Sequence, residues 1–323
     1  MKRFKKLIST LLFVTLICGT SIQAFAATGD IARTDPIEIS PERKAEAQAS
    51  LDALSPDEVM NQIKSNTSAD NTEHYQINEF DQIQELEEKS NAELIADGYT
   101  KDDIESIRNY DSIFDEQILT LAELSDESLK EFNYSSKQID LIRNYDGSSS
   151  QRAALAATCN VTVDVDKCSY NASTKRTSSR VTTSFVWSGV PAIKLKDALM
   201  TGWNGWYLAG KTANIKYKYI YNSTTKWQTP TFITGNDGGT SLGCGYTFNS
   251  SIDDNYYYAV EGYEIFTVDT SGAKDMYATG LYAKRSVSAT PSITFSLSGT
   301  QVSITVNSTT ANYRGSDNMR VQY

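Results

Sequence analysis

Residues 159–168 read CNVTVDVDKC, and at this stretch the chain changes character. Its three valines alternate with polar residues, which is the two-residue period of a β-strand with one buried and one solvent-facing side. Asp164 and Asp166 would share the polar side, about 7 Å apart. Two carboxylates at that separation suit the acid/base pair of a glycosidase or the ligation of calcium, and plain solvent exposure explains them equally well.

The chain after this stretch predicts antiparallel β-structure. Residues 292–297 and 301–306 both alternate and are separated by a short Ser-Gly-Thr connection, which predicts a hairpin. Further strands are predicted at 161–165, 181–187, 215–221, 256–268, 276–287 and 319–323, and a short helix at 192–200. About eight strands with few helices between them predict an antiparallel β-sandwich or barrel over 159–323.

Charge divides the chain at the same place. Residues 27–158 carry 29 Asp and Glu against 11 Lys and Arg, whereas residues 159–323 carry 11 against 15. So acidic a region repels the phosphates of nucleic acid, which excludes a nucleic-acid-binding function for it. The composition predicts an α+β multidomain protein with a boundary near Gly147.

The acidic region, residues 27–146, predicts helices. Ser40-Pro41 and Ser55-Pro56 each place an N-cap serine before a proline at the first helical position. The serine-rich residues 147–158 predict a linker between the two regions. Arg152 in this linker would be an exposed site for processing by an external protease.

The acidic region contains the pentapeptide IRNYD twice, as part of longer repeats at 86–111 and 121–146. Each repeat has the length of a helical hairpin. Thr100 and Ser135 are predicted N-caps, each preceded by a tyrosine and followed four residues on by an isoleucine, the pattern of a hydrophobic staple. We therefore predict two helix–turn–helix units in which RNYD closes a helix. A partner-binding ridge presented twice is the functional alternative.

The beginning of the chain predicts export. A basic start, an apolar stretch at 7–17 and a small-residue site ending at Ala26 are typical of a signal peptide over residues 1–26, cut after Ala26. No later segment has the roughly 18 consecutive apolar residues that a transmembrane helix needs. The sequence therefore predicts a secreted, extracellular protein with no transmembrane helix after signal cleavage.

Three cysteines follow the predicted signal peptide: Cys159, Cys168 and Cys244. Export permits a disulfide, which would leave one thiol over. If residues 161–165 form one extended strand, Cys159 and Cys168 lie about 30 Å apart. Cys244 is then the better partner for one of the two, and the sequence leaves open which.

Histidine content limits the chemistry. The single histidine, His74, lies in the acidic region, so the predicted β-region has no imidazole for proton transfer. Ser-His-Asp or Cys-His catalysis and zinc sites with two or three histidines are excluded there. A solvated surface residue is the simplest interpretation of His74. We predict no cofactor, and calcium is left open with no support beyond Asp164 and Asp166.

Aromatic residues are concentrated after Cys159, where 14 of the 19 tyrosines and all four tryptophans lie. The Asn-Gly pair between Trp203 and Trp206 predicts a tight hairpin that sets the two tryptophans opposite each other. We favour burial for this pair, with contact to a sugar or a membrane as the alternative. Tyr256, Tyr257 and Tyr258 must alternate across their strand, so at least one ring is predicted to face solvent.

A family resemblance can be stated on these motifs. The pattern Leu-x4-Tyr-[Thr/Ser]-x3-Ile-x2-Ile-Arg-Asn-Tyr-Asp at 94–111 and 129–146, followed by Phe-Val-Trp-Ser-Gly-Val-Pro at 185–191, resembles uncharacterised secreted proteins of Gram-positive, spore-forming bacteria. The resemblance spans both regions loosely. It implies an extracellular location and no established activity, and no catalytic residue carries over from it.

Three functions fit the sequence. The favoured one is a secreted, non-enzymatic extracellular protein whose β-region binds a glycan, the cell wall or a protein partner. The alternative is a secreted precursor, in which the acidic region is a prosegment released near Arg152 from a C-terminal effector such as a toxin, a bacteriocin-like factor or an inhibitor. The third is a hydrolase that uses Asp164 and Asp166, although nothing in the sequence indicates an enzyme.

Overall fold

The computed structural model describes residues 39–65, 71–194, 196–234, 242–254, 256–285, 293–298, 301–306, 313–315 and 319–322. The described residues belong to one compact unit of the chain, Ile37–Tyr323. The predicted signal peptide and its cleavage site at Ala26 lie outside the described residues. Across the described residues, no helix is long and apolar enough to cross a membrane. This unit combines helices with antiparallel sheets, as the α+β prediction requires.

The larger sheet, sheet A, is built around the strand of alternating valines. Its strand order is β1–β2–β3–β10–β5–β6, with antiparallel pairing throughout and β9 added beside β10. The side chains of Val161, Val163 and Val165 are buried on one face of β2, as their alternation predicts. The strands are β1 (Thr72–Asn78), β2 (Thr158–Asn171), β3 (Arg176–Ser188), β5 (Tyr207–Tyr219), β6 (Thr225–Gln228), β9 (Ser251–Ile252) and β10 (Tyr257–Ser271).

The second sheet, sheet B, has the order β14–β11–β4–β8–β7, with β15 also paired to β11. The helix predicted at 192–200 is wrong, because Lys196–Trp203 form strand β4. Every residue of β4 after Lys196 is buried, so the strand lacks the alternation that would have revealed it. The other strands are β7 (Phe232–Thr234), β8 (Gly243–Asn249), β11 (Met276–Arg285), β14 (Tyr313–Gly315) and β15 (Met319–Val321).

Sheets A and B pack face to face around an aromatic core. Phe185 of β3 stacks on Phe248 of β8 with ring centroids 5.0 Å apart. Trp203 of β4 lies 5.1 Å from Phe266 of β10. Burying one large apolar side chain stabilises a fold by roughly 1.5–3 kcal/mol, so these contacts across the two sheets are a main source of stability.

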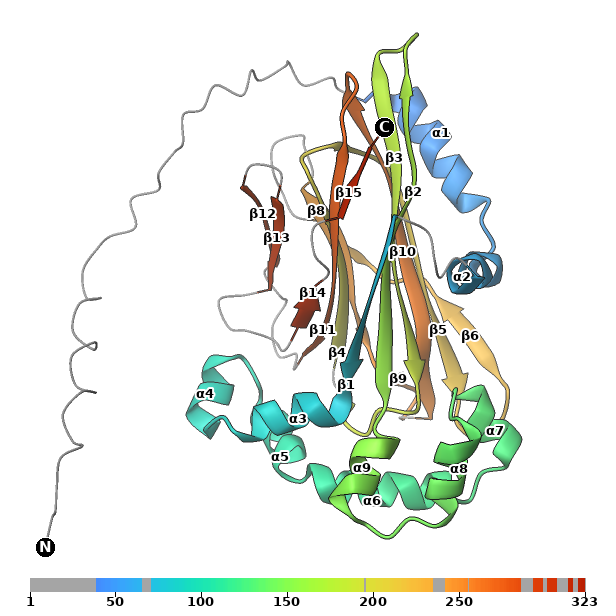
Figure 1. Ribbon diagram of the computed structural model, residues 1–323, viewed down its shortest axis with the longest axis vertical. Coiled ribbons are helices and arrows are strands. Elements are labelled where there is room, and N and C mark those ends of the chain that lie inside the picture. Colours follow the sequence, from blue (N-terminus) through green and yellow to red (C-terminus); the bar gives the residue numbers. More distant parts are fainter. Residues whose placement is uncertain are drawn as a thin grey trace, which may run out of the picture. The chain divides into compact units, whose positions relative to one another are not determined.

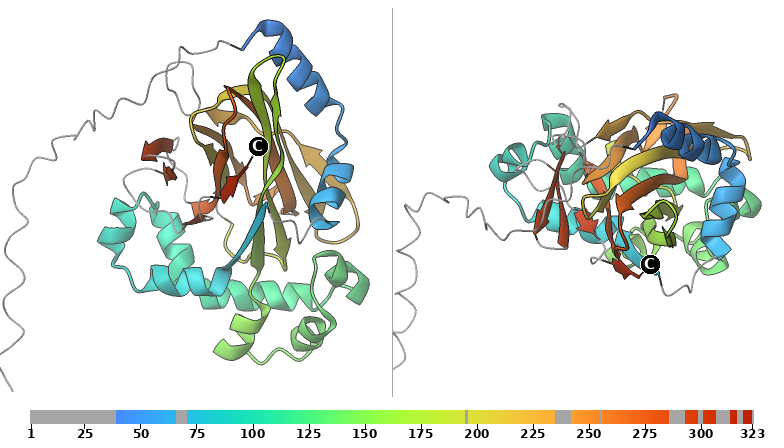
Figure 2. Two further views of the ribbon diagram at one scale, coloured as in Figure 1. Left: turned by 45° about the horizontal axis from the view of Figure 1, so that its top comes forward. Right: turned by 90° about the horizontal axis from the view of Figure 1, so that it is seen from above.

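A separate hairpin covers the outer face of sheet B. Strands β12 (Ile293–Ser298) and β13 (Gln301–Val306) pair with each other, which confirms the predicted hairpin. The hairpin approaches β4 and β8 closely: a Cβ added to Gly202 would lie 2.7 Å from Val302, and one added to Gly243 would lie 2.1 Å from Phe295. Larger residues at these two glycines would push the hairpin away. Figure 2 shows the hairpin on the side of the sheets opposite α1 and α2.

The IRNYD repeats form two helix–turn–helix units, as predicted. The capping boxes at Thr100 and Ser135 are both present, and the residue two positions before each has a left-handed backbone, Gly98 with φ 89° and Asn133 with φ 61°. The first unit is α4 (Asn91–Ala96) and α5 (Lys101–Arg108), and the second is α7 (Asp126–Glu131) and α8 (Ser136–Arg143). The neighbouring helices are α3 (Glu79–Glu87), α6 (Tyr110–Leu121) and α9 (Ser149–Leu155).

The repeated arginine ties each unit to the helix before it. Arg108 donates to the carbonyl oxygens of Glu87, at 2.7 Å, and Lys89. Arg143 donates to the carbonyl oxygens of Ala122 and Leu124, the positions that correspond 35 residues later. Carbonyl groups at a helix C-terminus lack partners within the helix, and a cation satisfies them well. The arginine of the motif therefore has a structural capping role, the simpler of the two interpretations, but in the first copy Tyr110 and Asp111 begin α6, so the prediction that the whole motif closes a helix is wrong there.

The helices and the sheets share one interior. Strand β1 comes from the acidic region, and every residue of β1 pairs with a residue of β2. Ser149–Leu155 form α9 where the sequence predicts a linker, and Ile37–Tyr323 make up a single compact unit with no division near Gly147. Buried Glu79 accepts hydrogen bonds from the backbone N–H groups of Ala192 and Ile193, at 2.9 and 3.1 Å. Figure 1 shows α3–α9 gathered at one end of the sheets.

Helices α1 (Pro41–Asp52) and α2 (Pro56–Ser65) lie on the outer face of sheet A (Figure 2). Ser40 caps α1, as predicted, by accepting a hydrogen bond from the N–H of Arg43 at 3.3 Å. The Arg43 guanidinium also binds the buried carboxylate of Asp269 on β10 at 2.8 Å. Lys64 of α2 forms an ion pair with Glu261 of the same strand. These contacts cross-link the first two helices to the sheet.

Candidate functional site

Trp203 and Trp206 are buried between the two sheets, with 0% and 1% of their surfaces exposed. The residues between them connect β4 of sheet B to β5 of sheet A, so the hairpin predicted for the Asn-Gly pair is wrong. Gly205 has φ 72°, and the indole Nε1 of Trp203 donates to the carbonyl oxygen of Trp206 at 3.1 Å. The favoured burial of this pair is confirmed, and neither ring is available to a ligand.

The three consecutive tyrosines at the start of β10, with Tyr256 just before the strand and Tyr257 and Tyr258 within it, have different environments. Tyr256 is 47% exposed, whereas Tyr258 is 5% exposed and packs among the residues of the helical core. Burial raises the pKa of Tyr258 to about 12. The prediction that at least one ring faces solvent is confirmed at Tyr256.

Tyr256 belongs to an aromatic surface that we call the tyrosine cluster: Tyr219, Tyr221, Tyr256 and Tyr257. Ring centroids lie 5.1 Å apart for Tyr219 and Tyr257, and 6.1 Å apart for Tyr221 and Tyr256. The rings are tilted against each other by 46° to 64°. Tyr221 is 50% exposed. Together the rings form an uneven, partly exposed aromatic wall.

Backbone pairing holds the tyrosine cluster in place. Tyr257 lies opposite Tyr219 in the pairing of β10 with β5, and the N–H of Ile220 donates to the carbonyl oxygen of Tyr256 at 2.9 Å. The turn before Tyr256 uses two left-handed residues, Asp253 and Asp254, with φ 52° and 53°. Because the rings project from paired strands and short turns, their arrangement exists before any ligand arrives.

The charges beside the tyrosine cluster are paired. The Nζ of Lys226 lies 3.9 Å from the centre of the Tyr257 ring and forms an ion pair with Asp253. Lys218 lies 3.2 Å from Glu131 of α7. The hydroxyl of Ser223 also donates to Glu131, and this hydrogen bond, followed by Lys218, lowers the pKa of that carboxyl. The surroundings of the rings are therefore polar without an excess of positive charge.

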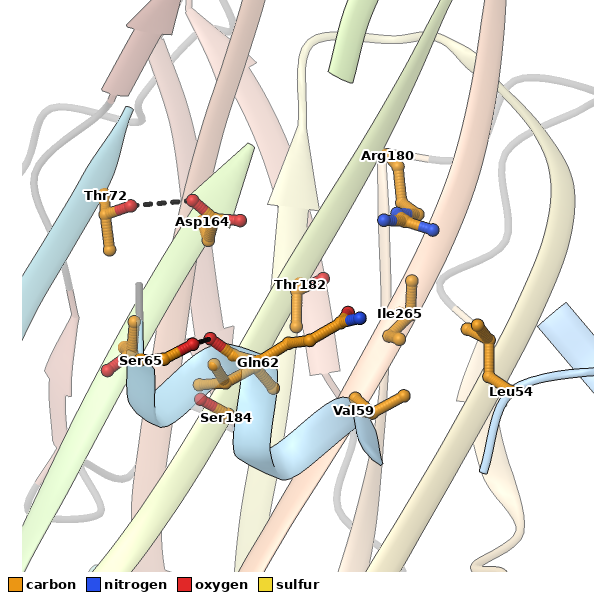
Figure 3. A pocket seen from close by; sticks show the side chains of 12 residues that line it. Leu54, Val59, Gln62, Ser65, Thr72, Asp164, Arg180, Thr182, Ser184 and Ile265 are labelled. Carbon is orange, nitrogen blue, oxygen red and sulfur yellow. Dashed lines mark hydrogen bonds between the residues drawn. The ribbon is translucent and has the colours of Figure 1, made fainter. Parts of the chain in front are cut away.

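A second candidate site is a pocket between α2 and the outer face of sheet A (Figure 3), with a volume of about 330 Å³. It contains Asp164, one of the two predicted acidic site residues, whose Oδ1 accepts a hydrogen bond from the Thr72 hydroxyl at 2.7 Å. The apolar lining consists of Leu54, Val59, Ile63 and Ile265. The polar lining consists of Gln62, Ser65, Thr72, Thr162, Asp164, Arg180, Thr182 and Ser184.

The side chain of Asp166, the second predicted acidic site residue, lies outside the part of the chain that the structure describes. The pairing of β2 with β3 shifts register between Val165 and Lys167. In the described part of the chain, no three His, Cys, Asp or Glu side chains gather as a metal site would need. Calcium binding at Asp164 and Asp166 stays a prediction.

His74 lies beside this pocket, on a strand that the sequence patterns did not predict. It belongs to β1, and its Nδ1 is 2.9 Å from the hydroxyl oxygen of Thr162. The sequence placed it in a helical region, although Tyr75 and Ile77 alternate with polar residues and are the buried positions of β1. That short period-two pattern was the signal that could have identified the strand.

Glu264 is a buried acid between the sheets. Its Oε1 accepts a hydrogen bond from Thr201 at 2.6 Å, while its Oε2 has no partner among the described residues. Burial raises the pKa of this carboxyl well above its ordinary value, which favours the neutral form. Glu261, three residues earlier, forms ion pairs on the outer face, so the two carboxylates point to opposite faces of the sheet. Glu264 cannot reach a substrate.

The remaining predicted site residues have structural roles. Cys159, Cys168 and Cys244 are all free thiols, so the disulfide that export would permit is absent. Cys159 and Cys168 lie at opposite ends of the extended strand β2, which is why they do not meet. Burial raises the pKa of Cys244 to about 12. Arg152 lies in α9 with 13% of its side chain exposed and is paired at 2.8 Å with both Asp111 and Asp115, rather than in an open linker.

No family model and no curated protein matches the chain. Among solved structures, one described as "Pore forming protein" has 8% identity and a TM-score of 0.23 over 50% of this chain and 84% of that chain. Another, titled "AvmM Catalyzes Macrocyclization in Alchivemycin A Biosynthesis", has 12% identity and a TM-score of 0.21 over 45% and 80%. Similarities this weak support no inference about the fold or function of this chain.

Proposed function

We propose that the protein is a secreted, non-enzymatic binding protein that holds a neutral glycan against the tyrosine cluster, with the two packed sheets as a β-sandwich scaffold. The observation that carries the proposal is the pair Tyr221 and Tyr256. They are the most exposed tyrosines of the described residues, at 50% and 47%, and their rings are neighbours, 6.1 Å apart. Neighbouring aromatic rings left in solvent are a feature of binding surfaces.

Tyrosine suits a sugar because it presents an apolar ring face and a polar tip in one side chain. A sugar ring likewise has C–H groups on its faces and hydroxyl groups around its edge. Such a ligand would place its C–H face on the half-exposed rings and its hydroxyls among their phenolic oxygens. Because the rings are tilted against each other, the surface is uneven, and a flat apolar partner could not contact both ring faces at once.

The charges around the cluster favour a neutral ligand. Lys218 and Lys226 are each paired with a carboxylate, Glu131 and Asp253, and exposed Asp254 adds a further negative charge nearby. An anionic membrane surface is recognised through unpaired basic residues, about 1 kcal/mol for each. This surface lacks such an excess among its described residues, so a neutral glycan fits it better than an anionic lipid headgroup.

The acidic helices belong to this site. Glu131 of α7 contacts both Lys218 and Ser223, which flank the turn that carries Tyr221. Removing the helices would leave Lys218 unpaired and change the charge beside the rings. The working molecule in this proposal is therefore the chain that retains the helices, and mass spectrometry of culture supernatant should find an intact chain beginning at Ala27.

A glycan array followed by isothermal titration with the best neutral glycan tests the proposal. The double variant Tyr221→Ala/Tyr256→Ala should weaken binding at least about fivefold, since each of the two ring contacts contributes about 0.5–1.5 kcal/mol. Tyr170→Ala is the matched control, because Tyr170 is 39% exposed and lies outside the cluster. Folded protein that binds no neutral glycan, or a double variant that binds as the wild type does, contradicts the proposal. Binding to vesicles containing phosphatidylserine, with no glycan binding, would instead indicate a membrane ligand.

A further inference from the structure

The pocket beneath α2 is an unusual way to pack a helix on a sheet. When a helix packs on a sheet only to stabilise the fold, large apolar side chains fill the space between the helix and the sheet. Here Thr182 and Ser184 of β3 face a space of about 330 Å³, although both side chains are largely buried. Unfilled space next to buried hydroxyl groups weakens the packing of α2 without any gain for the fold.

The polar groups of the pocket form a regular array. Thr72, Asp164, Thr182 and Ile265 lie opposite one another across four neighbouring strands, and Thr162 lies opposite Ser184 in the adjacent row. Side chains opposite each other in antiparallel strands are about 5 Å apart. The array therefore presents closely spaced hydroxyls around one carboxylate, while Gln62 and Ser65 face it from α2 (Figure 3).

The lining is balanced in charge and rich in hydroxyl groups. One carboxylate, Asp164, and one guanidinium, Arg180, leave no net charge to attract an anion such as phosphate. Donors and acceptors are both present, since a hydroxyl can serve as either. The apolar wall formed by Val59, Ile63 and Ile265 suits the C–H face of a ring. A volume at the lower end of the range for ligand pockets limits the ligand to one or two rings.

We propose that this pocket binds a single neutral sugar residue, as a free monosaccharide or the end of a chain. The Thr182 and Ser184 hydroxyls would bond the hydroxyl groups of the sugar, and Asp164, held by the Thr72 hydroxyl, would accept from two of them. The ring would lie against Ile63 and Ile265. The pocket shares no lining residue with the tyrosine cluster, so binding at each site can be tested independently of the other.

Saturation-transfer NMR and isothermal titration of the full secreted chain with D-glucose, D-galactose and N-acetyl-D-glucosamine test this site. At least one sugar should bind, and Thr182→Val/Ser184→Ala should weaken that binding about tenfold, the effect of losing two hydrogen bonds. The Thr182→Val change keeps the side-chain shape. Thr212→Val is the matched control, because Thr212 lies opposite Ile265 in the same row but outside the pocket.

The variants also separate this site from the tyrosine cluster. Tyr221→Ala/Tyr256→Ala should leave monosaccharide binding within about twofold of the wild type, because those rings lie outside the pocket. Circular dichroism and the Tm establish that each variant is folded. The proposal is overturned if folded wild type binds none of the three sugars, if the pocket variant binds as well as Thr212→Val does, or if L-alanine or inorganic phosphate binds there in preference to every sugar.

Discussion

The tryptophan pair, Trp203 and Trp206, and the tyrosine cluster contain the same kind of residue in opposite environments. Trp203 and Trp206 lie between the two sheets, where they contact other core residues and no solvent. Tyr221 and Tyr256 lie just beyond the ends of strands, where about half of each residue's surface is exposed. An aromatic ring stabilises a fold when it is buried and becomes available for binding when the surrounding chain leaves it uncovered.

The difference arises from the path that the chain takes at each aromatic stretch. After Trp203 the chain crosses from sheet B to sheet A, so both tryptophans fall in the interface between the sheets. Around Tyr221 and Tyr256 the chain turns back within sheet A, where β5 leads into β6 and β9 leads into β10. Turns that join strands of one sheet place their side chains at its end, beyond the reach of the facing sheet.

The largest expected effect is on stability and comes from the buried pair. Trp203→Ala should lower the free energy of unfolding by about 3–5 kcal/mol, because it removes a large core side chain and leaves a cavity beside Phe266. Tyr221→Ala/Tyr256→Ala should change it by less than about 0.5 kcal/mol per residue. Urea denaturation of both variants measures the contrast. Equal losses for the two variants would contradict the division between a buried and an exposed aromatic region.

The buried carboxyl of Glu264 should make the stability of the protein depend on pH. Its folded-state pKa is raised by burial above the ordinary value of 4.5, so the folded protein holds this proton more tightly than the unfolded chain does. The resulting stabilisation is complete below pH 4.5 and is lost as the pH rises through the folded-state pKa. The stability of Glu264→Gln should lack this decline. Glu105 is exposed and provides a control, since Glu105→Gln should keep the wild-type dependence of unfolding free energy on pH. If wild type and Glu264→Gln show the same dependence, the decline is not caused by Glu264.

Much of the β-structure could be predicted because its strands carry a period-two pattern. The hairpin of β12 and β13 and the strand around Val161–Val165 are present, and the strand predicted at 256–268 is present as β10, Tyr257–Ser271. Strand β4 was missed because it is buried on both faces and shows no alternation. Strand β1 was missed because seven residues between helices give a weak signal, although its pairing with β2 joins the two regions.

A smaller effect is expected at the edge of the tyrosine cluster. Lys226→Ala should lower the free energy of unfolding by about 0.5–1 kcal/mol, because it removes the ammonium group over the Tyr257 ring and the exposed ion pair with Asp253. The ion-pair part should disappear in about 1 M salt. Lys137→Ala, at an exposed position of α8, is the control and should have no measurable effect. A loss above about 2 kcal/mol at Lys226 would show that this region is part of the core.

The candidate sites were only partly predictable. Tyr256 and Tyr257 could be identified because consecutive aromatics cannot all be buried on one side, but Tyr219 and Tyr221 join them through pairing of distant strands. Asp164 was identified from alternation, whereas its pocket depends on α2 lying over the sheet, which no local pattern encodes. The exposed linker position predicted for Arg152 is wrong because its serine-rich surroundings begin a capped helix, α9, in which Ser148 accepts a hydrogen bond from the N–H of Gln151.

Whether the tyrosine cluster binds a glycan is measured by titrating a neutral glycan, selected by array, into wild type and into Tyr221→Ala/Tyr256→Ala. We predict that the wild type binds and that the folded double variant binds at least about fivefold more weakly, while Tyr170→Ala binds as the wild type does. Unchanged affinity in the double variant would show that the exposed rings are not the binding surface.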